Sequence, residues 1–134
     1  MKHIQVAAAI IVEQGRVFAA RRNNTGELAL KWEFPGGKLE PGESGETAIV
    51  REILEELSVK VEVECHVMTV YHQYHTCAVT MEAYLCAVMD GNIQLTEHVE
   101  GRWLRADQLY TVDWAAADMP IVEALVSMLQ SENS

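Results

Sequence analysis

The chain has 134 residues, of which 49% are hydrophobic and 22% charged, and these values predict a single globular domain over residues 1–134. The formal net charge of −10 disfavours binding to a nucleic-acid polymer, and no apolar run of about 18 residues predicts a membrane span. The three cysteines lack CxxC spacing and the N-terminus lacks a signal-peptide pattern, so we expect reduced thiols and a cytoplasmic location.

The first third of the chain predicts two strands, a loop and a short third strand. Apolar residues fill 4–12 and 16–20, and Glu13-Gln14-Gly15 between them predicts a turn. The polar segment 23–30 predicts a loop, an element that often contacts ligands. Residues 31–35 then predict a short strand that ends at Pro35.

The segment after Pro41-Gly42 predicts a helix that ends near Ser58. Glu52, Glu55 and Glu56 have the i, i+3, i+4 spacing that places side chains on one helix face. The opposite arc is apolar and is expected to pack against the core; it contains Val50, Ile53, Leu54 and Leu57. Ser58 occupies a position where glycine usually forms a left-handed cap, which should cost on the order of 1 kcal/mol.

The second half of the chain predicts long strands, short turns and a final helix. Strands are expected over 59–70 and 76–88, joined by a turn over 71–75. A turn over 90–92, an irregular segment over 93–101, a strand over 102–104 and a helical turn over 106–109 follow. The last helix is expected to start at Asp118 or Met119, with Pro120 in its first turn, and to end in a frayed tail over 131–134; its apolar face contains Ile121, Leu125, Met128 and Leu129. One early and one late helix among mixed strands indicate an α+β fold or an α/β sandwich.

The three clustered glutamates of the first helix suggest a metal site. Like charges at i, i+4 destabilise a helix by a few tenths of a kcal/mol unless a cation neutralises them. Carboxylate oxygens suit Mg²⁺ or Mn²⁺ better than zinc, and the histidines show no spacing that predicts a zinc site. The alternative interpretation is a solvated acidic helix face.

A longer pattern favours the metal interpretation. The segment 37–59 resembles the Nudix box. Its pattern is Gly37, five residues, Glu43, seven residues, Arg51-Glu52-Ile53, one residue, Glu55-Glu56, one residue, and Ser58-Val59. The one departure is Ser58, where the family has glycine. The resemblance implies a Nudix fold, an α/β/α sandwich with a mixed sheet between helices, and it extends to MutT-like nucleoside triphosphate pyrophosphohydrolases through Arg21-Arg22, the segment 32–38, Glu97 before Trp103, and the segment 117–120.

This resemblance implies roles for individual residues. The implied metal ligands are the carbonyl of Gly36 and the carboxylates of Glu52, Glu55, Glu56 and Glu97, with Glu100 as a rival of Glu97. They would hold two or three Mg²⁺ ions, and Glu52 or Glu55 would take the proton of the attacking water. Glu43 and Arg51 would form an orienting pair behind the ligands. Arg22 and Lys38 would meet phosphates, and Phe34 and Asp118 would contact the nucleotide.

The base that is preferred depends on Asp118. An ionised Asp only accepts hydrogen bonds, which suits the N4 amine of cytosine, and the pattern around Asp118 is similar to the CTP pyrophosphohydrolase branch. An Asp held protonated by burial could donate, so 8-oxo-dGTP remains an alternative substrate, and Asp118 could instead be a helix cap. A non-catalytic nucleotide sensor is a further alternative, and ADP-ribose hydrolysis is disfavoured by the short chain. The expected partner is a small-molecule nucleotide, and the protein could be a monomer or a homodimer.

Overall fold

The computed structural model describes residues 2–132. Its elements, in chain order, are β1 (Lys2–Glu13), β2 (Arg16–Arg21), β3 (Trp32–Glu33), β4 (Gly36–Lys38), α1 (Gly45–Leu57), β5 (Lys60–Gln73), β6 (Cys77–Asp90), β7 (Glu100–Leu104), the 3₁₀ helices η1 (Ala106–Thr111) and η2 (Ala116–Asp118), and α2 (Met119–Glu132). None of the helices in this part of the chain is long and apolar enough to cross a membrane.

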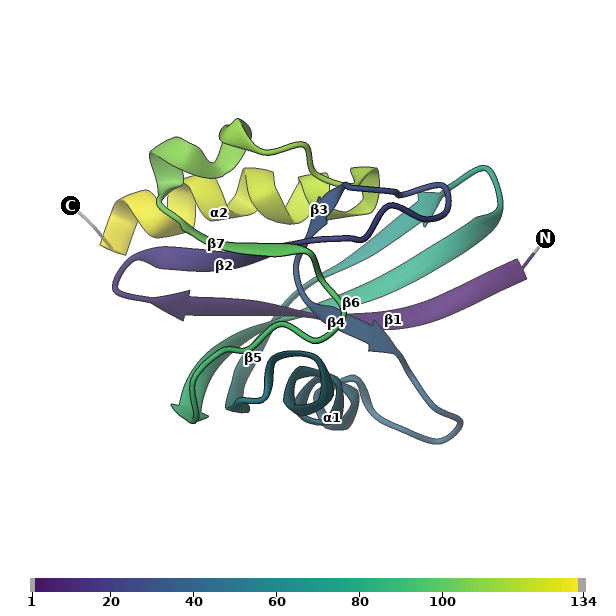
Figure 1. Ribbon diagram of the computed structural model, residues 1–134, viewed down its shortest axis with the longest axis horizontal. Coiled ribbons are helices and arrows are strands. Elements are labelled where there is room, and N and C mark those ends of the chain that lie inside the picture. Colours follow the sequence, from purple (N-terminus) through teal and green to yellow (C-terminus); the bar gives the residue numbers. More distant parts are fainter. Residues whose placement is uncertain (1, 133–134) are drawn as a thin grey trace.

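The strands form a mixed sheet between two helices (Figure 1). The order is β3-β2-β1-β6-β5, with β4 paired to β1 and β7 paired to β2. Strands β1 and β6 are parallel, with Val6 opposite Met81, and the other pairs are antiparallel. Helix α1 covers one face and α2 the other (Figure 1), which confirms the expected sandwich.

Alternation along β1 divides the core into two clusters. Ala8 and Ile10 belong to the cluster that contains Ile121 and Leu125 of α2. Ala7, Ala9 and Ile11 point the other way and pack with Ile49, Ile53 and Leu57 of α1. The central strand is therefore buried on both faces, which fixes the position of both helices relative to the strand ends that carry the site.

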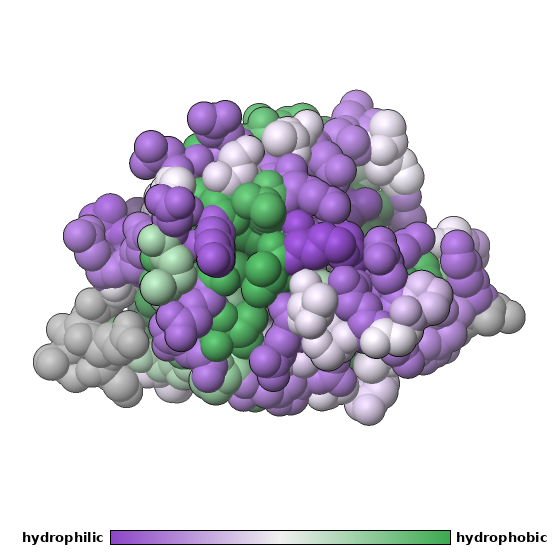
Figure 2. All heavy atoms as spheres, turned by 90° about the horizontal axis from the view of Figure 1, so that it is seen from below, coloured by the Kyte–Doolittle hydropathy of each residue, from purple (hydrophilic) through white to green (hydrophobic). Residues whose placement is uncertain are grey.

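The apolar face predicted for α1 was wrong at two positions. Val50 is 37% exposed and Leu54 is 56% exposed, whereas Ile49 is fully buried and Glu56 is only 6% exposed. The helix is rotated toward Ile49 because Glu56 points inward and accepts a hydrogen bond from the Gly36 N–H at 3.3 Å. Val50 and Leu54 instead border a hollow with Met89. Figure 2, viewed from the side of α1, shows an apolar area on this face of the molecule.

The two helix ends support one prediction and correct another. Ser58 has φ 60° and ψ 27°, and its N–H bonds to the Leu54 carbonyl, so the predicted left-handed cap is confirmed. Helix α2 begins at Met119, and Asp118 lies in the preceding 3₁₀ turn, where its carboxylate bonds to Phe34 instead of capping the helix. Met128, expected on the apolar face of α2, is 37% exposed. The tail predicted over 131–134 lies largely outside the described residues.

Strand boundaries also differ from the sequence predictions. The predicted turn over 71–75 is shorter, because β5 continues to Gln73 and β6 starts at Cys77. The predicted strand over 31–35 retains only Trp32–Glu33, and Gly36–Lys38 forms a separate strand, β4, against β1. Gly36 lies opposite Ala8, and a Cβ added to it would overlap the Ala7 carbonyl oxygen. Glycine is therefore required for this close strand approach.

Candidate active site

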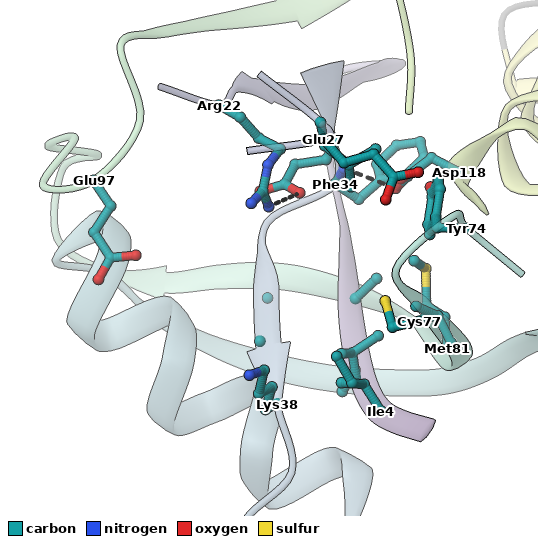
Figure 3. A pocket seen from close by; sticks show the side chains of 18 of the residues that line it. Ile4, Arg22, Glu27, Phe34, Lys38, Tyr74, Cys77, Met81, Glu97 and Asp118 are labelled. Carbon is teal, nitrogen blue, oxygen red and sulfur yellow. Dashed lines mark hydrogen bonds and ion pairs between the residues drawn. The ribbon is translucent and has the colours of Figure 1, made fainter. Parts of the chain in front are cut away.

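A cavity of about 450 Å³ lies beside β1 and β4 (Figure 3). The cavity is lined by all four residues predicted to contact substrate: Arg22, Phe34, Lys38 and Asp118. Gly36, Glu56 and Glu97, from the predicted ligand set, line the same cavity. In Figure 3, Glu97 and Lys38 lie on one side of the cavity and Asp118 on the other. The fold therefore brings predicted metal, phosphate and base residues around one space.

Strand β4 lies against two glutamates of α1, Glu52 and Glu56, of which Glu56 lines the cavity. The Gly36 N–H donates to Oε2 of Glu56 at 3.3 Å. A Cβ on Gly37 would come within 2.5 Å of Cδ of Glu52, so a side chain at this position would displace that carboxylate. The paired glycines thus serve both the strand pairing with β1 and the packing of α1 carboxylates on β4.

Glu56 is a buried carboxyl group among other carboxylates. Burial is the main cause that raises its pKa to about 8, and the charges of Glu33, Glu52 and Glu97 contribute further, against the hydrogen bond from Gly36. Like charges gathered around a buried acid are destabilising unless a proton or another cation compensates them. The site therefore has a local excess of negative charge that a divalent cation would relieve.

Arg51 binds the carboxylates on the exposed side of α1. Its Nε and one terminal nitrogen, Nη2, donate to the two oxygens of Glu43 at 2.9 and 2.8 Å, a bidentate pair. Its Nη1 donates to Glu52 at 2.6 Å, and Nη2 also donates to the Lys38 carbonyl at 3.1 Å. The hydrogen bond from Arg51 is the main cause that lowers the pKa of Glu43 to about 2. The Glu43–Arg51 contact is the one expected from the sequence.

The loop after β6 places Glu97 in the site and Glu100 outside it. Glu97 lines the cavity, whereas Glu100 starts β7 and accepts from Arg102 Nε at 2.7 Å. The loop is attached to the end of α1, where Gln94 N–H donates to the Leu57 carbonyl and Thr96 N–H to the Glu56 carbonyl. The geometry thus favours Glu97 over Glu100 as the loop ligand.

The part of the cavity predicted to contact the nucleotide contains Asp118. This residue is 2% exposed, and its Oδ1 accepts from the Phe34 N–H at 3.1 Å. Burial, followed by the charge of Glu33, raises its pKa well above the usual range. The Phe34 ring stacks on Trp114 with centroids 4.7 Å apart, so the backbone that contacts Asp118 is held in place. Tyr74 lines the same part of the cavity and accepts from the Ala117 N–H through its hydroxyl.

Comparison with known proteins identifies the family. A family model described as a NUDIX domain matches residues 6–124. The chain belongs to the Nudix family. The resemblance drawn from the sequence is thereby confirmed, and the box helix of that resemblance is α1.

Relatives of this Nudix protein act on nucleotides according to their names. The chain is 34% identical over 128 residues to a CTP pyrophosphohydrolase of Escherichia coli K12, covering 96% of this chain and 95% of the relative. It is 31% identical over 126 residues to an 8-oxo-dGTP diphosphatase of the same strain, covering 93% and 98%. The solution structure of the E. coli ORF135 protein superposes with a TM-score of 0.81 at 35% identity, covering 96% of this chain and 91% of that one.

The donor set of this Nudix protein fits a hard divalent cation, but it is not closed around one point. Among residues 2–132, no three His, Cys, Asp or Glu side chains converge closely enough to hold an ion as they stand. Glu52 is engaged by Arg51, and the side chain of Glu55 is 61% exposed. Both lie on the same face of α1 as Glu56, and carboxylate oxygens are the ligands that Mg²⁺ prefers.

Several residues of the site were missed from the sequence. Glu33 accepts from Arg22 Nη1 at 3.0 Å and lies 2.8 Å from His98 Nε2. Glu27 accepts from the N–H groups of His75 and Thr76 and so joins the 23–30 loop to the β5–β6 turn. The residues of these contacts are far apart in sequence, so periodicity could not reveal them. The loop prediction for 23–30 and the resemblance over Arg21-Arg22 and 32–38 pointed to this part but gave none of these contacts.

Proposed function

We propose that this Nudix protein is a cytoplasmic nucleoside triphosphate pyrophosphohydrolase that uses Mg²⁺, or alternatively Mn²⁺, and converts (d)CTP or modified nucleotides to the monophosphate and pyrophosphate. The observation that carries the proposal is the shared cavity of Glu56, Glu97, Lys38, Arg22 and Asp118. One side offers carboxylates for metal, the other a buried acid for the base, and cationic side chains are available to the phosphates. The names of the relatives support this class of reaction.

The proposed metal ligands are the Gly36 carbonyl, Glu52, Glu55, Glu56 and Glu97. Bound divalent cations would neutralise phosphate charge and lower the pKa of the attacking water. Glu52 or Glu55 would accept the proton of that water, since both lie on the face of α1 next to Glu56. Arg51 contacts Oε1 of Glu52, so Oε2 could meet a metal ion while Arg51 keeps its bidentate contact with Glu43.

The phosphates would be bound by Arg22 and Lys38. Lys38 presents a flexible ammonium group from β4, and Arg22 is oriented by its bond to Glu33. Two cations beside the carboxylates would neutralise charge on the triphosphate that the ions do not reach. The net charge of −10 makes these local positive groups important for substrate binding.

The base preference follows from the state of Asp118. Its Oδ1 is occupied by the Phe34 N–H, which leaves Oδ2 to meet the base. An ionised Oδ2 accepts from the N4 amine of cytosine, which supports CTP and dCTP as substrates. Because burial raises the pKa of Asp118, a protonated Oδ2 could donate to an oxidised guanine, and 8-oxo-dGTP is the second candidate.

A substrate panel tests this proposal. CTP, dCTP, UTP and 8-oxo-dGTP are incubated with the protein and Mg²⁺, and kcat/KM is obtained from pyrophosphate release. The proposal expects CTP or dCTP to lead and UTP to be poor. If 8-oxo-dGTP leads, the second candidate replaces the first. Tight nucleotide binding without turnover of any of the four would support a sensor instead.

A further inference from the structure

The loop that carries Glu97 is anchored by a side chain on each side of it. The residues before and after Glu97 are Thr96 and His98, and each contacts a different part of the site. We infer that Thr96 and His98 are positioning residues that hold the loop with Glu97 at the cavity, beside the C-terminal end of α1. This inference rests on the proposed function, because it concerns one of the proposed metal ligands.

Thr96 attaches the loop to the C-terminal end of α1. Its hydroxyl Oγ1 lies 3.1 Å from the Glu55 carbonyl and 3.0 Å from the Glu56 carbonyl. These carbonyls belong to the last turn of the helix, where no intrahelical N–H is available to them. The hydroxyl therefore links Thr96, the residue before Glu97, to the backbone of two proposed ligands.

His98 attaches the loop to β3 on the other side. Its side chain is 5% exposed, and Nε2 lies 2.8 Å from Oε2 of Glu33. An ionised carboxylate only accepts, so Nε2 carries the proton and donates. The second ring nitrogen, Nδ1, is buried and has no hydrogen-bond partner among residues 2–132, so the Glu33 contact alone sets the ring orientation through hydrogen bonding.

Glu33 connects this anchor to the rest of the cavity. Its other oxygen, Oε1, accepts from Arg22 Nη1 at 3.0 Å, and its charge raises the pKa of both Glu56 and Asp118. Glu33 therefore lies between the metal side and the base side. Through it, His98 fixes Glu97 relative to the same carboxylate that orients the phosphate-binding Arg22.

Backbone contacts offer a competing explanation. The N–H of Thr96 donates to the Glu56 carbonyl and the N–H of Val99 to the Arg21 carbonyl, at 3.1 and 3.0 Å. If these bonds were sufficient, removing the two side-chain anchors would leave Glu97 in place. The side chains matter because Glu97 is exposed in the loop, and only flanking contacts limit its position.

The test measures binding of Mn²⁺ alone to metal-stripped protein by isothermal titration calorimetry. Thr96→Val and His98→Ala should each weaken Mn²⁺ binding by about tenfold, the lower end for loss of a group that orients a ligand. Thr96→Ser keeps the hydroxyl and His98→Gln keeps a donor near Glu33, so both should stay within about threefold of the parent. Glu97→Gln gives the effect of losing the ligand itself.

Matched controls come from an equivalent cluster away from the cavity. His66 Nε2 lies 2.5 Å from Glu82 Oε2, and Thr69 Oγ1 donates to the same oxygen at 2.8 Å. His66→Ala removes a His–Glu contact and Thr69→Val removes a threonine hydroxyl bond, and both should leave Mn²⁺ affinity unchanged. Melting curves establish folding, and His98→Asn, whose amide is too short for the Glu33 contact, replaces His98→Ala if the latter is unfolded.

The outcomes separate this inference from the proposed function. Parent-like Mn²⁺ affinity in Thr96→Val and His98→Ala, or equal losses in the His66 and Thr69 controls, overturns the positioning role. A parent-like Glu97→Gln removes Glu97 from the ligand set and overturns the inference while the remaining glutamates stand. Absence of Mn²⁺ binding by the parent protein overturns the proposed function itself.

Discussion

Replacing Glu56 with Gln should stabilise the metal-free protein even though it removes a proposed metal ligand. Glu56 is 6% exposed, and burial together with neighbouring carboxylates raises its pKa from 4.5 to about 8. Between these two values the folded protein binds more protons than the unfolded chain, so its stability falls as pH rises through this window. Gln carries no charge and its Oε1 can still accept from the Gly36 N–H.

The size of the effect follows from the width of the pKa shift. Each pKa unit corresponds to about 1.4 kcal/mol. Because Glu56 ionises more readily in the unfolded chain, the free energy of unfolding of the parent falls, relative to its value at low pH, by about 3 kcal/mol at pH 7 and about 5 kcal/mol above pH 8. These figures are upper limits, because the surroundings of the carboxyl relax. For 134 residues, a difference of about 3 kcal/mol corresponds to a rise in Tm of about 10 °C.

The assay is thermal unfolding in EDTA at pH 5, 7 and 9, followed by circular dichroism. The Tm difference between Glu56→Gln and the parent should be small at pH 5 and should grow toward pH 9. Glu55→Gln is the matched control, because the side chain of Glu55 is 61% exposed and its neutralisation should change Tm little. A Glu56→Gln protein that melts at or below the parent at pH 9, or an equal gain in Glu55→Gln, refutes the reasoning.

Other changes have distinct expected results. Glu55→Gln and Glu56→Gln should each lower kcat by at least about 100-fold without unfolding the protein, and near-normal turnover of both would make α1 an ordinary acidic helix. Ser58→Gly should raise stability by up to about 1 kcal/mol with unchanged activity, because Ser58 has φ 60°; a lower Tm would contradict this. Asp118→Asn should lower kcat/KM for CTP relative to UTP, by an amount that corresponds to about 1–3 kcal/mol of transition-state free energy, since its amide can present a donor to the N4 amine. Equal changes for all bases would leave Asp118 without a role in base choice.

The local parts of the site could be predicted because they depend on short spacings. The spacing of Glu52, Glu55 and Glu56 places them on one helix face. The Glu43–Arg51 pair was implied by the family resemblance, and the structure contains this contact. Positive φ at Ser58 followed from its place after the helix. These features need no knowledge of which elements pack together.

The rotation of α1 could not be read from periodicity. Ile49, Val50, Ile53, Leu54 and Leu57 support two overlapping apolar arcs. The structure selects the arc with Ile49, because the Glu56 side chain points inward and accepts from the Gly36 N–H. A tertiary contact of a polar residue thus decided which apolar residues became buried.

The network around Glu33 depends entirely on long-range contacts. His98 is 65 residues from Glu33 in sequence, and Asp118 is 84 residues from Phe34. Sequence spacing carries no information on such pairs. Asp118 was predicted through the family resemblance, whereas Glu33 was noticed only as part of a pattern, and its contacts with Arg22 and His98 emerged from the fold.

The central claim is that carboxylate-bound metal ions let this protein cleave a nucleoside triphosphate to a monophosphate. The most direct measurement is chromatographic analysis of the products formed from CTP with Mg²⁺, with excess EDTA, and with Glu55→Gln in Mg²⁺. We expect CMP and pyrophosphate in equal amounts with Mg²⁺, and almost no product in the other two samples. Undiminished cleavage in EDTA, or formation of CDP and inorganic phosphate, would contradict the claim.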